Sequence, residues 1–248
     1  MSLLSLPREV QLYILGLLPI RDLLSLSETC RSLKDLAQDP SNWKQLVLSY
    51  KNIKNNPKAC REHVARCSKL RELTIIHPDS NRTDSKSKFR SDQIMSVVMK
   101  AKNTLTTLSI GSFTFFGVSS FKKISQITNL TKLGINASNF IEAKEFFQLN
   151  NISKLRSLKI HHLHYVLGEA LGKTLVKLAL DCPGLEHLDV SGCLKNELII
   201  PVQYLEEFLR IASQARLRHL DIRDCDFNHK FVKNLKQKYP HIKIVDKH

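Results

Sequence analysis

The chain has 248 residues, 42% of them hydrophobic, and a formal net charge of +15, which suits one large domain or a small module joined to a larger one. The sequence contains no run of 18 apolar residues, so no membrane span is expected. The N-terminus has no basic region of the kind typical of a secretory signal. The six cysteines are scattered without a CxxC pair, which favours reduced thiols in an intracellular protein, cytoplasmic, nuclear or both.

Residues 6–46 predict three short helices. Pro7 suits the first turn of a helix because its missing N–H needs no partner there. Pro19 ends that helix, and a third helix ends near Asp39 and Pro40. Apolar residues recur at helical spacing in the first helix: Val10, Ile14, Leu17 and Leu18. About forty residues cannot bury this much apolar surface alone, so the segment predicts either a helical cap on a larger domain or a docking surface.

The same segment resembles an F-box without insertion or deletion. The matching residues are Leu6, Pro7, Glu9, Val10, Ile14, Leu15, Leu18, Pro19, Asp22, Leu23, Leu24, Cys30, Arg31, Leu36, Asp39, Pro40, Trp43 and Leu46. Leu15 stands where phenylalanine is common, and Leu33 stands where an aromatic residue is usual. Both remain apolar, so these departures concern the affinity for a docking partner more than the resemblance to the F-box family.

This resemblance implies a docking partner and no cofactor. F-box proteins dock on a Skp-type adaptor, which binds a cullin scaffold and a RING subunit. By resemblance, the expected adaptor-binding residues are Leu6, Pro7, Ile14, Leu15, Leu18, Pro19, Leu23 and Trp43. Residues 1–48 would form the F-box, and residues 49–248 would hold a protein substrate for ubiquitination.

From residue 70 onward, a Leu-x-x-Leu-x-(Ile/Val) pattern occurs six times. Its first leucines are Leu70, Leu105, Leu130, Leu155, Leu185 and Leu217. The second and third apolar residues are two apart, so both point to the same side of a strand. Such copies are typical of leucine-rich repeats, which stack into a curved solenoid. The fold class is therefore predicted to be α/β, with three N-terminal helices and a parallel inner sheet.

Other segments complete this organisation. Helices are expected at 58–67, 92–102, 118–127, 141–149, 166–182, 204–215 and 230–239. The residues at 175–180 also spell the strand pattern but lie too close to the next copy, so they are assigned to helix. Short strands are expected at 43–48 and 242–245, a turn at 51–57, and a mobile loop at 77–91.

Two repeats resemble the cysteine-containing subclass of leucine-rich repeats. They run from Cys182 to Cys193 and from Leu217 to Cys225. In that subclass, which is commonly joined behind an F-box, a cysteine after the strand turns into the core.

Strand geometry predicts which residues face the concave side. One row contains Thr74, Ser109, Gly134, Lys159, Asp189 and Asp221. The next contains Ile76, Gly111, Asn136, His161, Ser191 and Arg223. Concave faces of solenoids commonly bind partners, so the polar members are the candidate substrate-binding residues.

The sequence gives little support for a catalytic or metal-binding site. His161 and His162 are adjacent in a strand and would diverge, and no acidic or cysteine ligand accompanies them. No catalytic triad or phosphate-binding loop is present, so the chain is expected to be non-catalytic. Two alternatives to a ubiquitin-ligase substrate receptor remain: a non-degradative scaffold, and a basic solenoid that binds nucleic acid. The nucleic-acid alternative is favoured by the surplus of seven positive charges in residues 51–100. However, the sequence has no recognised nucleic-acid-binding motif.

Overall fold

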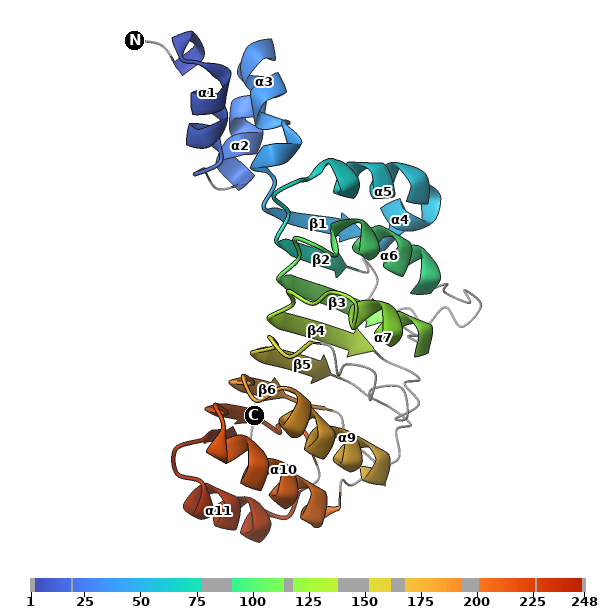
Figure 1. Ribbon diagram of the computed structural model, residues 1–248, viewed down its shortest axis with the longest axis vertical. Helices are drawn as coiled ribbons and strands as arrows, with labels where there is room; N and C mark the ends of the chain where they lie inside the picture. Colours follow the sequence, from blue (N-terminus) through green and yellow to red (C-terminus); the bar gives the residue numbers. More distant parts are fainter. Residues whose placement is uncertain are drawn as a thin grey trace.

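A computed structural model describes residues 3–18, 20–76, 91–113, 118–137, 152–161, 168–192, 201–225 and 227–246. Helices at the N-terminus are followed by an open sheet of eight parallel strands, stacked in chain order from β1 to β8 (Figure 1). The predicted α/β class is confirmed. No helix in the described part of the chain is long and apolar enough to cross a bilayer.

The three predicted N-terminal helices are present and form a helical module at one end of the sheet (Figure 1). They are α1 (Arg8–Leu15), α2 (Ile20–Ser27) and α3 (Arg31–Ala37), with short 3-10 helices η1 (Leu3–Ser5) and η2 (Pro40–Asn42) on either side. Pro7 directly precedes α1, as its fixed φ favours. The module has its own small core, made by Leu15, Leu23, Leu36 and Ala37.

The eight strands carry one row of buried apolar residues in common register. The strands are β1 (Gln45–Ser49), β2 (Glu72–Ile76), β3 (Thr107–Phe113), β4 (Lys132–Ala137), β5 (Ser157–His161), β6 (His187–Asp189), β7 (His219–Asp221) and β8 (Lys243–Val245). The row consists of Leu46, Leu73, Leu108, Leu133, Leu158, Leu188, Leu220 and Ile244. The six repeat strands and the two outer strands are thus confirmed.

The helices between the strands pack on the apolar face of the sheet in one continuous core. They are α4 (Tyr50–Asn55), α5 (Pro57–Arg66), α6 (Ser91–Val98) with η3 (Met99–Ala101), α7 (Val118–Ile124), α9 (Gly168–Asp181), α10 (Val202–Gln214) and α11 (His229–Lys238). All of these except α4 match predicted helices within a few residues, and residues 175–180 are helical as expected. The predicted helix at 141–149 lies outside the described residues.

One local prediction is wrong: the segment 51–57 is not a turn. Residues 50–55 form helix α4, because Ser49 accepts a hydrogen bond from the Asn52 N–H and Ile53 is fully buried in the core. Asn56 then caps α5 in the same way, with Pro57 at its first position. Of the predicted mobile loop at 77–91, residues 77–90 lie outside the described residues, and Ser91 begins α6.

The helical module is tied directly to the sheet. Trp43 stands three residues before Leu46, the place of the first leucine in the later repeats, and packs against the solenoid core. Its ring lies edge-on to His63, with centroids 6.2 Å apart. Lys44 Nζ also donates to the Gly16 carbonyl at 2.6 Å. The proposed boundary at residue 48 therefore falls within β1, a strand of the sheet.

A buried thiol, Cys182, and a half-buried thiol, Cys225, join successive repeats. Cys182 Sγ donates to the Ile152 carbonyl and Cys225 Sγ to the Val190 carbonyl, both at 3.4 Å. Each bond satisfies a backbone oxygen of the preceding unit, which would otherwise be costly to bury. Cys193 lies outside the described residues.

Candidate protein-binding surfaces

The helical module exposes a group of large apolar side chains. Tyr13 and Leu17 of the first helical segment are 68% and 65% exposed, and Leu4 and Val10 are 43% and 42% exposed. Val10, Tyr13 and Leu17 are spaced by three and four residues, so they lie along one face of α1 and its C-terminal turn. A contiguous exposed apolar face is typical of a protein-binding surface. We call Val10, Tyr13 and Leu17 the apolar face.

The structure divides the predicted adaptor-binding residues into three groups. Leu15 and Leu23 are 0% and 2% exposed and belong to the core of the module. Pro7 is exposed, and the half-buried residues are Leu6, Ile14 and Leu18. Trp43 packs on the solenoid, and Pro19 lies outside the described residues.

The sequence predicted only some of these exposed apolar residues. Val10 and Leu17 belong to the apolar stripe of the first helix, but nothing in the sequence shows which side of the stripe remains uncovered. Tyr13 and Leu4 lie outside the predicted set altogether. Their exposure follows from where α2 and α3 pack on α1.

The first predicted row of the concave face is continuous in the structure. Thr74, Ser109, Gly134, Lys159, Asp189 and Asp221 are paired strand to strand, and Val47 and Val245 extend the row at its ends. In the second row, Asn136 lies opposite His161. Ser191 and Arg223 follow β6 and β7 in turns, where Ser191 Oγ lies 2.9 Å from His161 Nδ1.

A third row on the same face was missed. It lies one residue before the buried leucine of each strand, and alternation along a strand places it beside the first row. Its members are Gln45, Glu72, Thr107, Lys132, Ser157, His187, His219 and Lys243. The period-two rule could have found it from the sequence.

The C-terminal half of the concave face contains a pocket of about 470 Å³. It brings together four predicted residues with four that were missed, and its lining consists of Ser157, Lys159, His187, Asp189, His219, Asp221, Arg223 and Val245. The His187 and His219 rings are 5.7 Å apart. Burial, followed by the neighbouring His187, lowers the pKa of His219 below its ordinary value. The pocket therefore offers neutral and basic hydrogen-bonding groups.

Two carboxylates of this pocket are already engaged. Asp189 and Asp221 are only 7% and 5% exposed. Asp189 accepts the Ser191 N–H and lies 3.4 Å from His161 Nε2. Asp221 accepts the Arg223 N–H and a bidentate contact from its guanidinium, at 2.7 to 3.1 Å. Partial burial raises the pKa of Asp221, but the Arg223 hydrogen bonds outweigh it and the net pKa is lowered. These two residues shape the pocket, whereas Lys159 and His187 are exposed.

No group of three or more His, Cys, Asp or Glu side chains in the described residues could hold a metal ion. Of the histidines considered above for that role, His161 pairs with Asp189 and Ser191. His162 lies outside the described residues.

Comparison with known proteins identifies the helical module. Residues 3–49 match the family model described as F-box-like. These residues form an F-box-like domain. The F-box-like domain therefore includes the apolar face and ends in β1, and no curated protein matches the sequence of the chain.

Among solved structures, the chain is similar to an internalin from Listeria monocytogenes. The TM-score is 0.45 and the sequence identity 14%, with 75% of this chain and 51% of the internalin covered. The chain thus spans about half the length of that protein.

Proposed function

We propose that this protein is a substrate receptor of an SCF-type ubiquitin ligase. The F-box-like domain would dock on a Skp-type adaptor, which in turn binds a cullin and a RING subunit. The repeat region, which we assign to the cysteine-containing leucine-rich repeats because Cys182 and Cys225 cap carbonyls of preceding units, would hold a protein substrate. The chain itself performs no covalent step and raises the effective concentration of the substrate near the ubiquitin-conjugating enzyme.

The observation that carries this proposal is the apolar face on an F-box-like domain. Tyr13 and Leu17 expose most of their surface although the domain has its own core, and a docked adaptor would remove this area from water. Pro7 and Ile14, from the predicted set, extend the proposed surface. Leu15 and Leu23 support it from the core.

The rigid joint at Trp43 and Lys44 fits a role in positioning. Because Leu46 and Leu48 of the same segment belong to the solenoid core, the F-box-like domain cannot swing freely relative to the concave face. A bound substrate would therefore be held at a fixed place relative to the adaptor. Fixed orientation is what a proximity mechanism requires.

The proposed substrate-binding surface is the concave face around the C-terminal pocket. Lys159 and His187 are its exposed charged or titratable side chains, and Thr74, Ser109 and Asn136 continue the polar surface toward β2. We expect a Lys159→Ala, His187→Ala double variant to lose substrate binding while it keeps adaptor binding. Both side chains are exposed, so the variant should fold.

The adaptor test compares two double variants. Tyr13→Asp with Leu17→Asp places charges in the apolar face and should weaken binding to a purified Skp-type adaptor about 100-fold or more. Leu180→Asp with Val202→Asp is the matched control, because these residues are also exposed apolar residues but lie on α9 and α10. The control should bind like the unchanged chain. Failure of the unchanged chain to bind the adaptor would refute the proposal.

A cullin pull-down separates the receptor from the scaffold alternative. A receptor brings cullin with it through the adaptor, and a scaffold does not. Substrates should then accumulate on the intact chain when the proteasome is blocked. The comparison should use the Tyr13, Leu17 variant and not deletion of residues 1–48, because that deletion removes Trp43 and most of β1 from the solenoid.

A further inference from the structure

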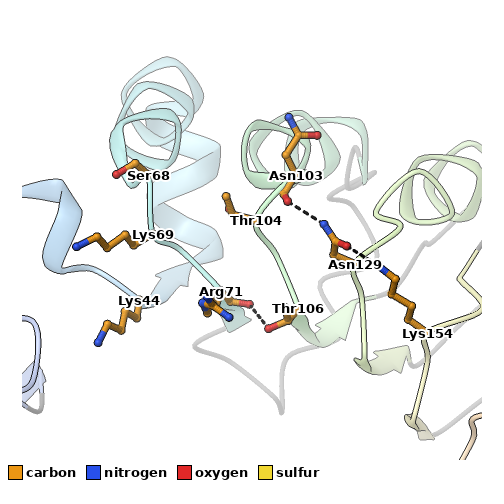
Figure 2. Close-up of a pocket in the computed structure, with 9 residues that line it drawn as sticks. All are labelled: Lys44, Ser68, Lys69, Arg71, Asn103, Thr104, Thr106, Asn129 and Lys154. Atoms are coloured by element: carbon orange, nitrogen blue, oxygen red, sulfur yellow. Dashed lines mark hydrogen bonds between the residues drawn. The ribbon is translucent and has the colours of Figure 1, made fainter.

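A shallow basic depression lies at the edge of the sheet where the strands begin (Figure 2). It has a volume of about 580 Å³, and none of its residues belongs to the concave rows proposed for the substrate. It is lined by Lys44, Ser68, Lys69, Arg71, Asn103, Thr104, Thr106, Asn129 and Lys154. Four of these residues are cationic, and none is acidic or aromatic. We call this surface the basic edge.

The backbone at the basic edge is tightly held. The Lys44 carbonyl accepts the N–H groups of Arg71 and Glu72, and the Arg71 carbonyl accepts those of Thr106 and Thr107, at 2.8 to 3.0 Å. The same two-donor arrangement continues through Thr106 and Thr131 toward β5. The basic edge is therefore a rigid ladder with strands roughly 4.8 Å apart, and its four strand steps extend over roughly 19 Å.

The positive charge on this ladder is not balanced within the described residues. No described carboxylate lies within ion-pair distance of Lys44, Lys69, Arg71 or Lys154. The next arginine beyond the basic edge does have a carboxylate partner, because Arg156 Nη1 lies 2.7 Å from Glu186 Oε1. A cluster of like charges in one depression raises the local potential and attracts anions.

Neutral side chains of the basic edge already form hydrogen bonds within the protein. Thr106 Oγ1 donates to the Arg71 carbonyl, and Asn129 Nδ2 donates to the Asn103 carbonyl. Lys154 Nζ donates to Asn129 Oδ1 at 2.9 Å, which fixes its direction while two of its N–H groups remain. The guanidinium of Arg71 and the ammonium of Lys69 are thus the main donors for a ligand. A guanidinium suits a carboxylate or phosphate group bidentately.

The shape of the site selects among anionic ligands. Lys44, Lys69 and Arg71 gather at one end, and Lys154 lies at the other, three strands further on (Figure 2). A single small anion cannot reach both ends, so the ligand must be extended and carry several charges. The lining has no aromatic ring on which a base could stack, which disfavours single-stranded nucleic acid.

We propose that the basic edge binds an extended acidic peptide segment of a partner protein. Arg71 and Lys69 hold one anionic side chain, and Lys154 holds another three strand steps away. Carboxylate and phosphoserine side chains share this chemistry. The site goes beyond the proposed substrate-receptor function, because neither the adaptor nor the concave face takes part in it.

The test measures fluorescence anisotropy of labelled octaglutamate with the full chain at about 0.1 M salt. Octaglutamate extends to roughly 26 Å and reaches both ends, whereas triglutamate extends to only roughly 10 Å. Lys69→Glu with Arg71→Glu should weaken octaglutamate binding at least about tenfold. Lys154→Glu should weaken octaglutamate about fivefold and leave triglutamate within about twofold.

The matched control is Lys230→Glu with Lys233→Glu on α11. It changes the net charge by the same amount as the Lys69, Arg71 variant, and both lysines are exposed. Octaglutamate affinity within about twofold of the unchanged chain supports the proposal. Equal weakening by both double variants would show attraction by net charge alone and would overturn it.

Two further arms define the ligand. An octapeptide with two phosphoserines in place of glutamates should bind at least as tightly as octaglutamate and depend on the same residues. Binding of oligouridylate without binding of either peptide would overturn the proposal in favour of nucleic acid. All these readouts are independent of adaptor binding, so their failure would leave the substrate-receptor proposal standing.

Discussion

Gly172 of α9 faces Tyr204 of α10 so closely that a Cβ atom at position 172 would lie 2.6 Å from Tyr204 Cβ. The Tyr204 ring covers this glycine, with Cγ and Cδ2 both 2.8 Å from the same point. Tyr204 Oη donates to Glu169 Oε1, one turn earlier on α9. The two helices thus pack through a glycine and a tyrosine.

Gly172→Ala should therefore destabilise the protein although alanine favours helices. The added methyl group would force α9 and α10 apart, at a cost of about 1–3 kcal/mol, which exceeds the helix-propensity gain of about 1 kcal/mol. Urea unfolding followed by circular dichroism measures the change. Gly111→Ala is the control, because a Cβ there meets the Ile75 carbonyl at an ordinary 3.6 Å. An equal effect at both glycines would contradict the steric account.

Trp43 should contribute to stability through its ring and not through its indole N–H. The ring packs against the solenoid core, whereas Nε1 is buried without a hydrogen-bond partner in the described structure. Trp43→Ala should lower the free energy of unfolding by about 3 kcal/mol. Trp43→Phe should cost less than half as much, because it keeps an aromatic ring and loses no hydrogen bond. Similar losses in the two variants would argue against this packing role.

Cys182 should resist alkylation in the folded protein. Burial, followed by the nearby charge of Asp181, raises the pKa of its thiol to about 11, so only about one thiol in a thousand is ionised at pH 8. Cys30 is exposed and provides the internal reference. Mass spectrometry after iodoacetamide treatment should find Cys30 modified well before Cys182. Equal rates of modification at Cys30 and Cys182 in the folded protein would contradict the prediction.

Arg223 should stabilise the protein in a pH-dependent way. Its hydrogen bonds lower the pKa of Asp221 below the ordinary 3.8, so the stabilisation is present above that pH and is lost as pH falls through the lower folded-state value. Arg223→Gln should lower the free energy of unfolding at pH 7 by a modest amount, because the guanidinium is partly exposed. Urea titrations should give a constant difference above about pH 5 and a smaller one below about pH 4. A difference independent of pH would contradict the ion-pair account.

The repeat strands could be predicted because their information is local. Each Leu-x-x-Leu-x-Ile copy places two apolar side chains on one side of a strand, and the same spacing recurs in every unit. Parallel stacking in register follows once identical units must bury identical edges. Even Trp43, which replaces the first leucine before β1, fits this spacing.

The surfaces could be predicted only in part. Leu15 and Leu23 belong to the F-box pattern as Pro7 and Ile14 do, yet the fold buries the first pair and leaves Tyr13 and Leu17 uncovered. Helix α4 was not predicted for a related reason. Its sequence is polar, and one buried residue, Ile53, packs it against the core.

The sequence by itself determined the F-box-like segment, the order of strands and the concave rows, because these depend on spacing along the chain. Tertiary structure alone decided which apolar side chains of the F-box-like domain face water. It also brought Arg71 and Lys154, 83 positions apart in the sequence, to one basic edge. The physical reason is that burial and charge compensation depend on neighbours supplied by distant segments, which no local pattern specifies.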